Sequence, residues 1–263
     1  MADKITSVLA REDNGNVQIT FTIPSEIVKK AQEEALEHLG ADIEISGFRK
    51  GKAPIEKVKE KISQSKLIEH SLGHLLPEAL GEAMKEHKLR LAMYPKYEVT
   101  KAEEGKDWEV KALSCELPEV KLGDYKKLLE KVEKKEDIIL KTLLENIKIT
   151  IPSILVEEEA NSRLSQLLER IEKLGLALEN YLTSVGKKAE DLRAEYAKQA
   201  SDAISIDLIL NAIALDLKIK ITKEEIEDAI KKTGATGEIP EDRRLLVESI
   251  LMRRSALDSL LKL

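Results

Sequence analysis

The sequence contains a single cysteine, Cys115, among 263 residues. One thiol cannot form a disulfide within the chain, and it cannot build a metal cluster made of several cysteines. Because Cys115 lies in an apolar-rich segment, we expect a small buried side chain and not a reactive nucleophile. The chemistry of this protein therefore does not depend on thiols.

Long apolar runs are also missing. No stretch approaches the roughly 18 consecutive apolar residues that a membrane-spanning helix requires. The first residues lead into an alternating polar segment and not into the apolar core of a secretory signal. We therefore expect a cytoplasmic protein that has no membrane partner.

Signatures of nucleotide binding and nucleophilic catalysis are absent from the sequence. The segment 47–51 lacks the spacing and the Lys-Ser/Thr end of a P-loop, and no serine-nucleophile motif occurs. His70 and His74 are four residues apart, which can place two imidazoles on one metal ion. No third ligand is evident, however, and His38 and His87 are isolated. We predict a structural or surface role for these histidines, with no metal site, no cofactor and no bound nucleotide.

Aromatic residues make up only 3% of the chain, whereas 42% is apolar and 35% is charged. A composition rich in Leu, Ile, Ala, Glu and Lys predicts a soluble and mainly helical protein. The length allows two domains with separate cores. The net charge of -6 argues against a general nucleic-acid binder, so any contact with RNA must be local.

The first part of the chain alternates between strand and helix patterns. Segments 5–11 and 17–23 alternate apolar and polar residues around an Asn-Gly pair, which predicts an antiparallel hairpin. A helix is expected from Ser25 to about Leu39, ended by Gly40.

Two further helices and a second pair of strands complete this part. The helices are expected at about 55–62 and 66–87, and the strands surround Tyr97 and Trp108. Antiparallel strands accompanied by helices predict an α+β domain that covers residues 1–117.

After an extended connector at 118–124 the strand signal nearly vanishes, which predicts an all-α domain over residues 118–263. Most of its apolar stripes should be core, and the sequence does not say which of their residues stay exposed. The helices are expected at about 126–146, 153–174, 178–185 and 192–217, then after a capping box of Thr222 and Glu225, and finally after Pro240, with a loop at Gly234 and Gly237.

The segment Gly47–Pro54 reads Gly-Phe-Arg-Lys-Gly-Lys-Ala-Pro and contains one of only two phenylalanines. Gly47 and Gly51 allow the backbone to turn sharply, and Pro54 fits the first turn of a helix. We therefore expect a loop that leads into a helix. An aromatic residue in such a loop, Phe48, either packs into its own core or docks into a partner.

The residues that follow Phe48 in the sequence are rich in positive charge. Residues 49–66 include seven basic and two acidic residues, which gives a local charge of +5. Arginine can hold a phosphate or carboxylate with two parallel hydrogen bonds, and lysines add a salt-sensitive attraction. A solvated helix face is the alternative interpretation. The basic residues are Arg49, Lys50, Lys52, Lys57, Lys59, Lys61 and Lys66, and the acidic ones are Glu56 and Glu60.

The octapeptide resembles the ribosome-docking signature of the trigger factor family, the bacterial chaperones that meet nascent chains at the exit tunnel. Segment 118–125 is similar to the stretch that leaves the N-terminal domain of that family. Segments 151–157 and 186–193 are similar to the opening and the middle of its C-terminal chaperone domain. Together these similarities cover most of the chain.

The resemblance implies docking on the large ribosomal subunit, with a tunnel-exit ribosomal protein and adjacent rRNA as partners. It also implies that the helical domain binds nascent and unfolded polypeptides. The residues that it assigns to ribosome binding are Gly47, Phe48, Arg49, Lys50, Gly51, Lys52 and Pro54, with Lys57 and Lys61 as secondary contacts to rRNA.

One departure from the family concerns catalysis. The family usually carries an FKBP-like prolyl isomerase domain of about a hundred β-rich residues. Between Tyr125 and Ile151 this chain has 25 residues, charged and helical in pattern and without an aromatic. We therefore predict an ATP-independent holdase that is not an enzyme. The alternatives are a prolyl isomerase with an unrecognised site and a ribosome-independent chaperone or assembly factor.

Overall fold

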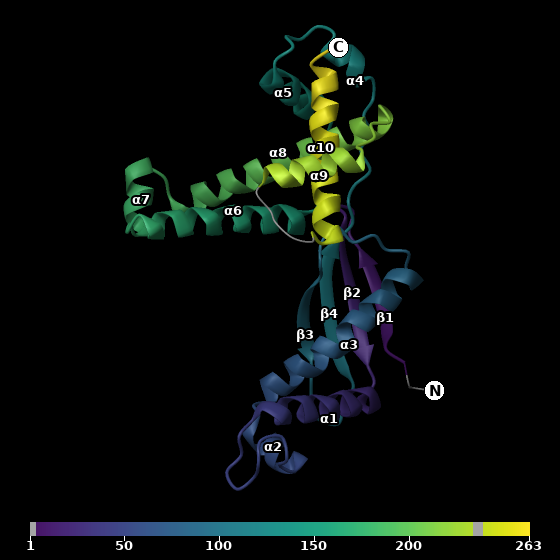
Figure 1. The fold of residues 1–263 in the computed structure, drawn as a ribbon, viewed down its shortest axis with the longest axis vertical. Coiled ribbons are helices and arrows are strands. Elements are labelled where there is room, and N and C mark those ends of the chain that lie inside the picture. Colours follow the sequence, from purple (N-terminus) through teal and green to yellow (C-terminus); the bar gives the residue numbers. More distant parts are fainter. Residues whose placement is uncertain (1–3, 234–238) are drawn as a thin grey trace. The chain divides into compact units, whose positions relative to one another are not determined.

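The structure is a computed structural model that describes residues 4–233 and 239–263. The chain divides into two compact units, Met1–Leu117 and Pro118–Leu263. Among the described residues, strands occur only in the first unit, and the second unit is helical (Figure 1). The predicted fold class, an α+β part followed by an all-α part, is confirmed. Within residues 4–233 and 239–263, no helix combines the length and the apolar character of a membrane-spanning segment.

A four-stranded antiparallel sheet forms one layer of the first unit. Its strands are β1 (Thr6–Arg11), β2 (Asn16–Ile23), β3 (Lys96–Lys101) and β4 (Trp108–Cys115), in the order β1-β2-β4-β3. The two predicted hairpins are present, with Gly15 in the left-handed region at the first turn. The central pair joins them, with Phe21 opposite Val110. Alternate side chains of this pair are fully buried, which gives the sheet one core-facing side.

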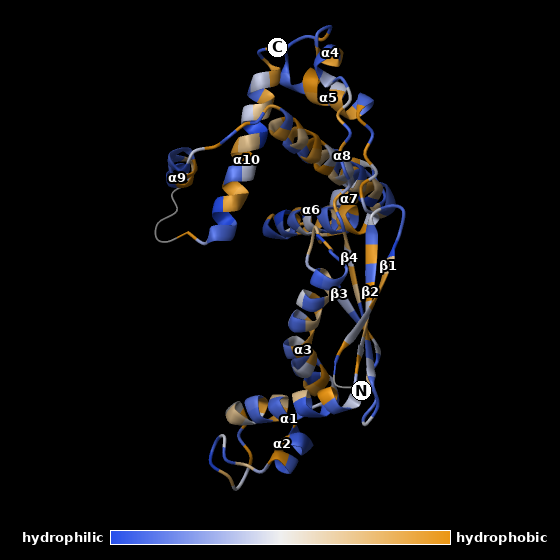
Figure 2. Ribbon diagram, turned by 90° about the vertical axis from the view of Figure 1, so that its right-hand side faces the viewer, coloured by the Kyte–Doolittle hydropathy of each residue, from blue (hydrophilic) through white to orange (hydrophobic). Residues whose placement is uncertain are grey.

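Helices α1 (Ser25–Asp42) and α3 (Gln64–Glu86) form the second layer, and the short α2 (Ile55–Lys61) packs on α1. Figure 2 shows that apolar and polar residues alternate along α1 and α3. Their apolar faces meet the sheet in a core that contains Val28, Leu76, Phe21 and Trp108. Amphipathic helices covering one face of a sheet explain the α+β architecture.

Gly40 does not end the first helix, because α1 continues to Asp42. The prediction of a stop at this glycine is wrong. A Cβ at position 40 would lie 3.0 Å from Cγ2 and 3.1 Å from Cγ1 of Val58. The glycine therefore lets α2 approach α1 closely and does not serve as a helix end.

The second unit consists of seven helices among its described residues. They are α4 (Tyr125–Leu129), α5 (Glu136–Asn146), α6 (Ser153–Lys173), α7 (Leu178–Val185), α8 (Ala189–Asp216), α9 (Lys223–Lys232) and α10 (Glu241–Leu260). α6 and α8 lie side by side, and α7 joins them at one end (Figure 1). The core lies where α4 and α5 meet the last turns of α8 and α10. The predicted capping box at Thr222 is confirmed. The loop predicted at Gly234 and Gly237 lies outside the described residues.

The prediction of a single helix at 126–146 is wrong, because this segment forms two helices, α4 and α5, joined by a loop. A continuous helix would separate Leu129 from Ile139 by about 15 Å along its axis. In the structure both side chains are fully buried in the same core. The Lys134 ammonium donates to the carbonyl oxygen of Leu129 at 2.7 Å and so caps the end of α4. Burial of both apolar groups outweighs local helix propensity.

The contact between Gly40 and Val58 predicts that replacing Gly40 and replacing Gly73 change the stability of the first unit differently. Gly40→Leu should lower the free energy of unfolding of the first unit by about 1–3 kcal/mol, because the new side chain overpacks against Val58. The matched control Gly73→Leu changes an exposed α3 glycine whose added Cβ would meet nothing within 4 Å. It should leave stability unchanged or raise it by up to about 1 kcal/mol.

Urea unfolding followed by tryptophan fluorescence measures both variants. Trp108 is the only tryptophan of the chain and is buried in the first unit, so its emission reports on that unit. Equal stability of Gly40→Leu and the unchanged protein would contradict the packing role of Gly40.

Candidate functional site

The candidate site is the segment 43–54, which connects α1 to α2. A small apolar cluster, separate from the main core, lies beneath it. Ile45 from the segment itself and Val58 from α2 are buried there against α1 and the start of α3. We call this the loop-base cluster. Its buried members are Ala35, Leu36, Ile45, Val58 and Leu67.

Two glycines shape the exposed part of this segment. Gly47 has φ +87° and Gly51 has φ +74°, both in the left-handed region that other residues adopt only at a cost. The Phe48 N–H donates to the carbonyl oxygen of Ile45 at 3.0 Å, and the Lys52 N–H donates to that of Arg49 at 2.9 Å. The backbone therefore makes two successive turns, stabilised by its own hydrogen bonds.

Phe48 is 44% exposed, whereas Phe21, the other phenylalanine, is fully buried. The ring is therefore not buried in a core of its own unit, and docking into a partner stays a prediction. Full burial of such a side chain contributes about 1.5–3 kcal/mol. Much of that free energy is not used within this chain and is available to a partner. The arrangement suits insertion of the ring into an apolar pocket of another molecule.

The predicted docking residues are all exposed. Their basic side chains differ in whether they form ion pairs. Arg49, Lys52 and Lys61 form no ion pair with another described residue. Lys57, in contrast, lies 2.9 Å from the carboxylate of Glu60.

Lys59 is paired as well, with its ammonium 2.7 Å from the carboxylate of Glu104. This hydrogen bond lowers the pKa of Glu104 below its ordinary value. Such exposed pairs contribute little and exchange partners readily. The positive charge is therefore least compensated at Arg49 and Lys52 in the loop and at Lys61, the last residue of α2.

Most of the exposed large apolar residues of the second unit lie on two of its parts, and Leu128, Leu215 and Leu263 lie elsewhere. The arm patch consists of Leu168 near the end of α6, Leu174 and Leu176 between α6 and α7, and Val185 at the end of α7. None of the residues of α7 is buried. Along the first turns of α10, the α10 patch consists of Leu245, Leu246 and Ile250. The predicted apolar stripe of this last helix is thus core only toward its end, where Leu257 is buried.

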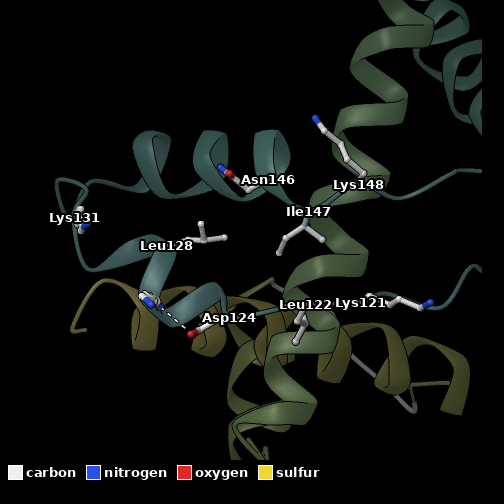
Figure 3. A pocket seen from close by; sticks show the side chains of 10 residues that line it. Lys121, Leu122, Asp124, Leu128, Lys131, Asn146, Ile147 and Lys148 are labelled. Carbon is white, nitrogen blue, oxygen red and sulfur yellow. Dashed lines mark hydrogen bonds between the residues drawn. The ribbon is translucent and has the colours of Figure 1, made fainter.

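A cavity of about 490 Å³ opens beside α4. In Figure 3, Leu128 and Ile147 point toward one another across it, whereas Lys121, Lys131 and Lys148 point away from its centre. Its described lining thus combines an apolar floor with a charged rim, and no set of acid, base and nucleophile converges in it. The cavity suits an apolar side chain better than it suits catalysis.

The remaining candidate side chains have different fates. Cys115 is buried as predicted, and burial raises the pKa of its thiol. His87 shares a hydrogen bond of 3.0 Å with the Ser7 hydroxyl. His38 is not isolated, contrary to the prediction, because packing of α1 on α3 brings it beside His70 and His74. A separation of 32 residues or more hides this contact from spacing arguments, which see only the pair on α3.

Two family models match the chain. One, described as bacterial trigger factor protein, matches residues 6–147. The other, described as the C-terminus of bacterial trigger factor protein, matches residues 124–261. Each covers more than half of the chain, and the two matches overlap at 124–147.

Curated relatives carry the same name. A trigger factor of Streptococcus mutans is 39% identical over 120 residues, which are 46% of this chain and 28% of that protein. A trigger factor of Staphylococcus epidermidis is 34% identical over 176 residues, or 67% of this chain and 37% of that protein. The chain thus spans about a third of the length of the curated relatives that it matches.

One solved structure shares the fold over nearly the whole chain. It comes from work on promiscuous substrate recognition in folding and assembly activities of the trigger factor chaperone. The similarity has a TM-score of 0.67 and covers 98% of this chain and 99% of the other, with 16% sequence identity. At this level of identity the likeness establishes the fold alone.

Proposed function

The chain belongs to the bacterial trigger factor family, and from this membership we propose that it is an ATP-independent chaperone. It docks at the tunnel exit of the large ribosomal subunit and shields nascent or unfolded polypeptides. The first unit is the ribosome-binding domain and the second is the client-binding domain. The observation that carries the proposal is the exposed Phe48 in a basic loop held by its own apolar base.

Docking combines an apolar anchor with charge. Phe48 fills a small apolar pocket of a tunnel-exit ribosomal protein. Arg49 pairs with carboxylate or phosphate through two parallel hydrogen bonds. Lys50 and Lys52 add attraction to rRNA, with Lys57 and Lys61 as secondary contacts.

The shape of the loop matters as much as its charge. Gly47 and Gly51 provide the turns, and Pro54 starts α2. The loop-base cluster orders both ends of the segment before binding. Less conformational entropy is therefore lost when the loop docks.

Client binding uses the arm patch and the α10 patch. Each is made of aliphatic side chains, whose contacts are non-directional and tolerate many sequences. Each contact is weak by itself, so a client is released without nucleotide hydrolysis. The cavity beside α4 offers a further place for one apolar side chain. No cofactor or nucleotide takes part in this cycle, which runs in the cytoplasm, where ribosomes are.

The proposal excludes prolyl isomerisation. In this chain the segment between the two family-like parts forms α4 and α5, whose apolar faces pack into the helical core. The overlap of the two family matches at 124–147 supports the same conclusion. The role is therefore that of a holdase.

Substitution of the loop should abolish docking. If Phe48, Arg49 and Lys50 contribute about 1–2 kcal/mol each, replacing all three by Ala weakens ribosome binding at least about a hundredfold. Co-sedimentation with ribosomes measures the affinity. The matched control replaces an exposed aromatic, arginine and lysine elsewhere in the first unit, Tyr94, Arg90 and Lys85, by Ala. Undiminished binding of the loop variant would overturn the docking assignment.

The salt dependence separates the two parts of the anchor. Phe48→Ala should lower the affinity by a similar factor at every salt concentration, because the lost contact is apolar. Arg49→Ala with Lys50→Ala should flatten the slope of log affinity against log salt, because fewer counterions are released on binding. Equal slopes for both variants would contradict the division of roles. A protein that does not bind ribosomes at all would favour the ribosome-independent chaperone or assembly factor.

The arm patch should contribute to client binding. Without nucleotide, the chain should suppress aggregation of a refolding protein at a few-fold excess. Replacing Leu168, Leu174 and Leu176 by Ser should raise the concentration needed by about three- to tenfold, because exposed apolar area is lost. Val8→Thr with Val99→Thr, exposed in the first unit, is the control. Unchanged suppression by the arm variant would remove the patch from the client surface.

Proline-limited refolding tests the exclusion of isomerase activity. The uncatalysed slow phase lasts tens to hundreds of seconds. Adding the chain in equimolar amount should leave its rate constant unchanged. Acceleration that grows with the concentration of the chain would instead establish a prolyl isomerase.

A further inference from the structure

Three of the four histidines of the chain lie together in the first unit. His38 is one turn from the end of α1, and His70 and His74 occupy successive turns of one face of α3. Their ring centroids are 5.0–5.9 Å apart. Each offers one ring nitrogen, and these nitrogens all lie within 4.8 Å of one another.

We propose that His38, His70 and His74 bind a divalent late first-row transition metal ion such as Zn²⁺. Zinc binds imidazole nitrogen at about 2.0–2.1 Å in tetrahedral sites, which places two ligand nitrogens about 3.4 Å apart. The nitrogens need to approach by at most about 1.4 Å from their present separation. His38 and His74 are exposed, so rotation of their side chains can close that distance.

The lack of hydrogen-bond partners for the three imidazoles favours a metal-binding role over simple packing. The Nδ1 atom of His70 is buried and has no hydrogen-bond partner. An unpartnered buried polar atom costs about 1–3 kcal/mol. None of the three rings forms a side-chain hydrogen bond or an ion pair with any described residue. Contacts between the rings do not provide a partner for the lone pair of a ring nitrogen. A metal ion bound by the cluster would accept these lone pairs.

The donor set selects the class of metal. Imidazole suits Zn²⁺, Cu²⁺, Ni²⁺ and Co²⁺, whereas Mg²⁺ and Ca²⁺ prefer oxygen ligands. No carboxylate of a described residue belongs to the cluster. Three protein ligands leave one position of a tetrahedral ion for water.

A bound ion would connect two helices close to the docking loop. His38 precedes Ile43, where the loop begins, by five residues, and its partners lie on α3. Because the unfolded chain does not hold the three rings together, the ion stabilises the folded first unit by mass action. The sequence-based prediction of no metal site rested on the missing third ligand, which His38 supplies.

Zn²⁺ and Co²⁺ titrations of the full chain, purified without a histidine tag, test the site. We expect one equivalent of Zn²⁺ per chain, and Co²⁺ should give the intense visible absorption of a tetrahedral complex. Zn²⁺ should also raise the melting temperature followed by Trp108 fluorescence by several degrees. Absence of stoichiometric binding at micromolar Zn²⁺ would overturn the proposal.

Variants assign the ligands. His38→Gln combined with His74→Gln changes exposed side chains only, and it should weaken Zn²⁺ binding at least a hundredfold and remove the thermal shift. The matched control His87→Gln lies outside the cluster and should bind Zn²⁺ like the unchanged protein. Equal affinity of the double variant, or an equal loss in the control, would contradict the assignment. These readouts do not involve ribosomes or clients, so they are independent of the proposed function.

Discussion

The close approach of α2 to α1 at Gly40 is the contact on which the site depends. Because position 40 has no side chain, Val58 can pack against the backbone of α1, and it is buried there with Ile45 and Leu67. This small core joins the two ends of the segment 43–54. The turns at Gly47 and Gly51 then hold Phe48 outside any core of its own unit. An apolar ring can stay exposed in a defined place only if the backbone beneath it is ordered by other contacts.

In the proposed function, the two units recognise their partners by different chemistry. The loop presents one aromatic ring beside arginine and lysines, a combination that suits one particular surface of matching shape and charge. The helical unit exposes aliphatic side chains in the arm patch and the α10 patch, and such side chains contact apolar groups without directional demands. A chain with a net charge of -6 can therefore approach RNA through one local basic segment without binding nucleic acid in general.

Local patterns were enough to predict most elements of this fold. Strict alternation around Asn14-Gly15 predicted the first hairpin, and the capping box of Thr222 predicted the start of α9. The octapeptide Gly47–Pro54 identified the candidate loop because its residues are contiguous. In each case the physical cause lies within a few residues of the feature, so the sequence contains it in readable form.

The sequence-based predictions that are wrong depend on contacts between residues distant in the sequence, or on which apolar residues become buried together. The prediction of a helix end at Gly40 is wrong because the role of this glycine depends on its contact with Val58. The break after Leu129 follows from a shared core with Ile139, which overrides helix propensity. His38 joins His70 only through packing of α1 on α3. Tertiary packing decided each of these features, and no local pattern reports it.

In the proposed function, Phe48 inserts into a pocket at the ribosomal tunnel exit. Site-specific photocrosslinking from position 48, with a photoreactive phenylalanine analogue in place of Phe48, tests it most directly. We predict a crosslink to one protein of the large subunit at the tunnel exit, and none from the same analogue at Tyr94, although Tyr94 is more exposed (68%) than Phe48 (44%). Equal yields from both positions, or no ribosomal product from position 48, would contradict insertion of Phe48 into the ribosome.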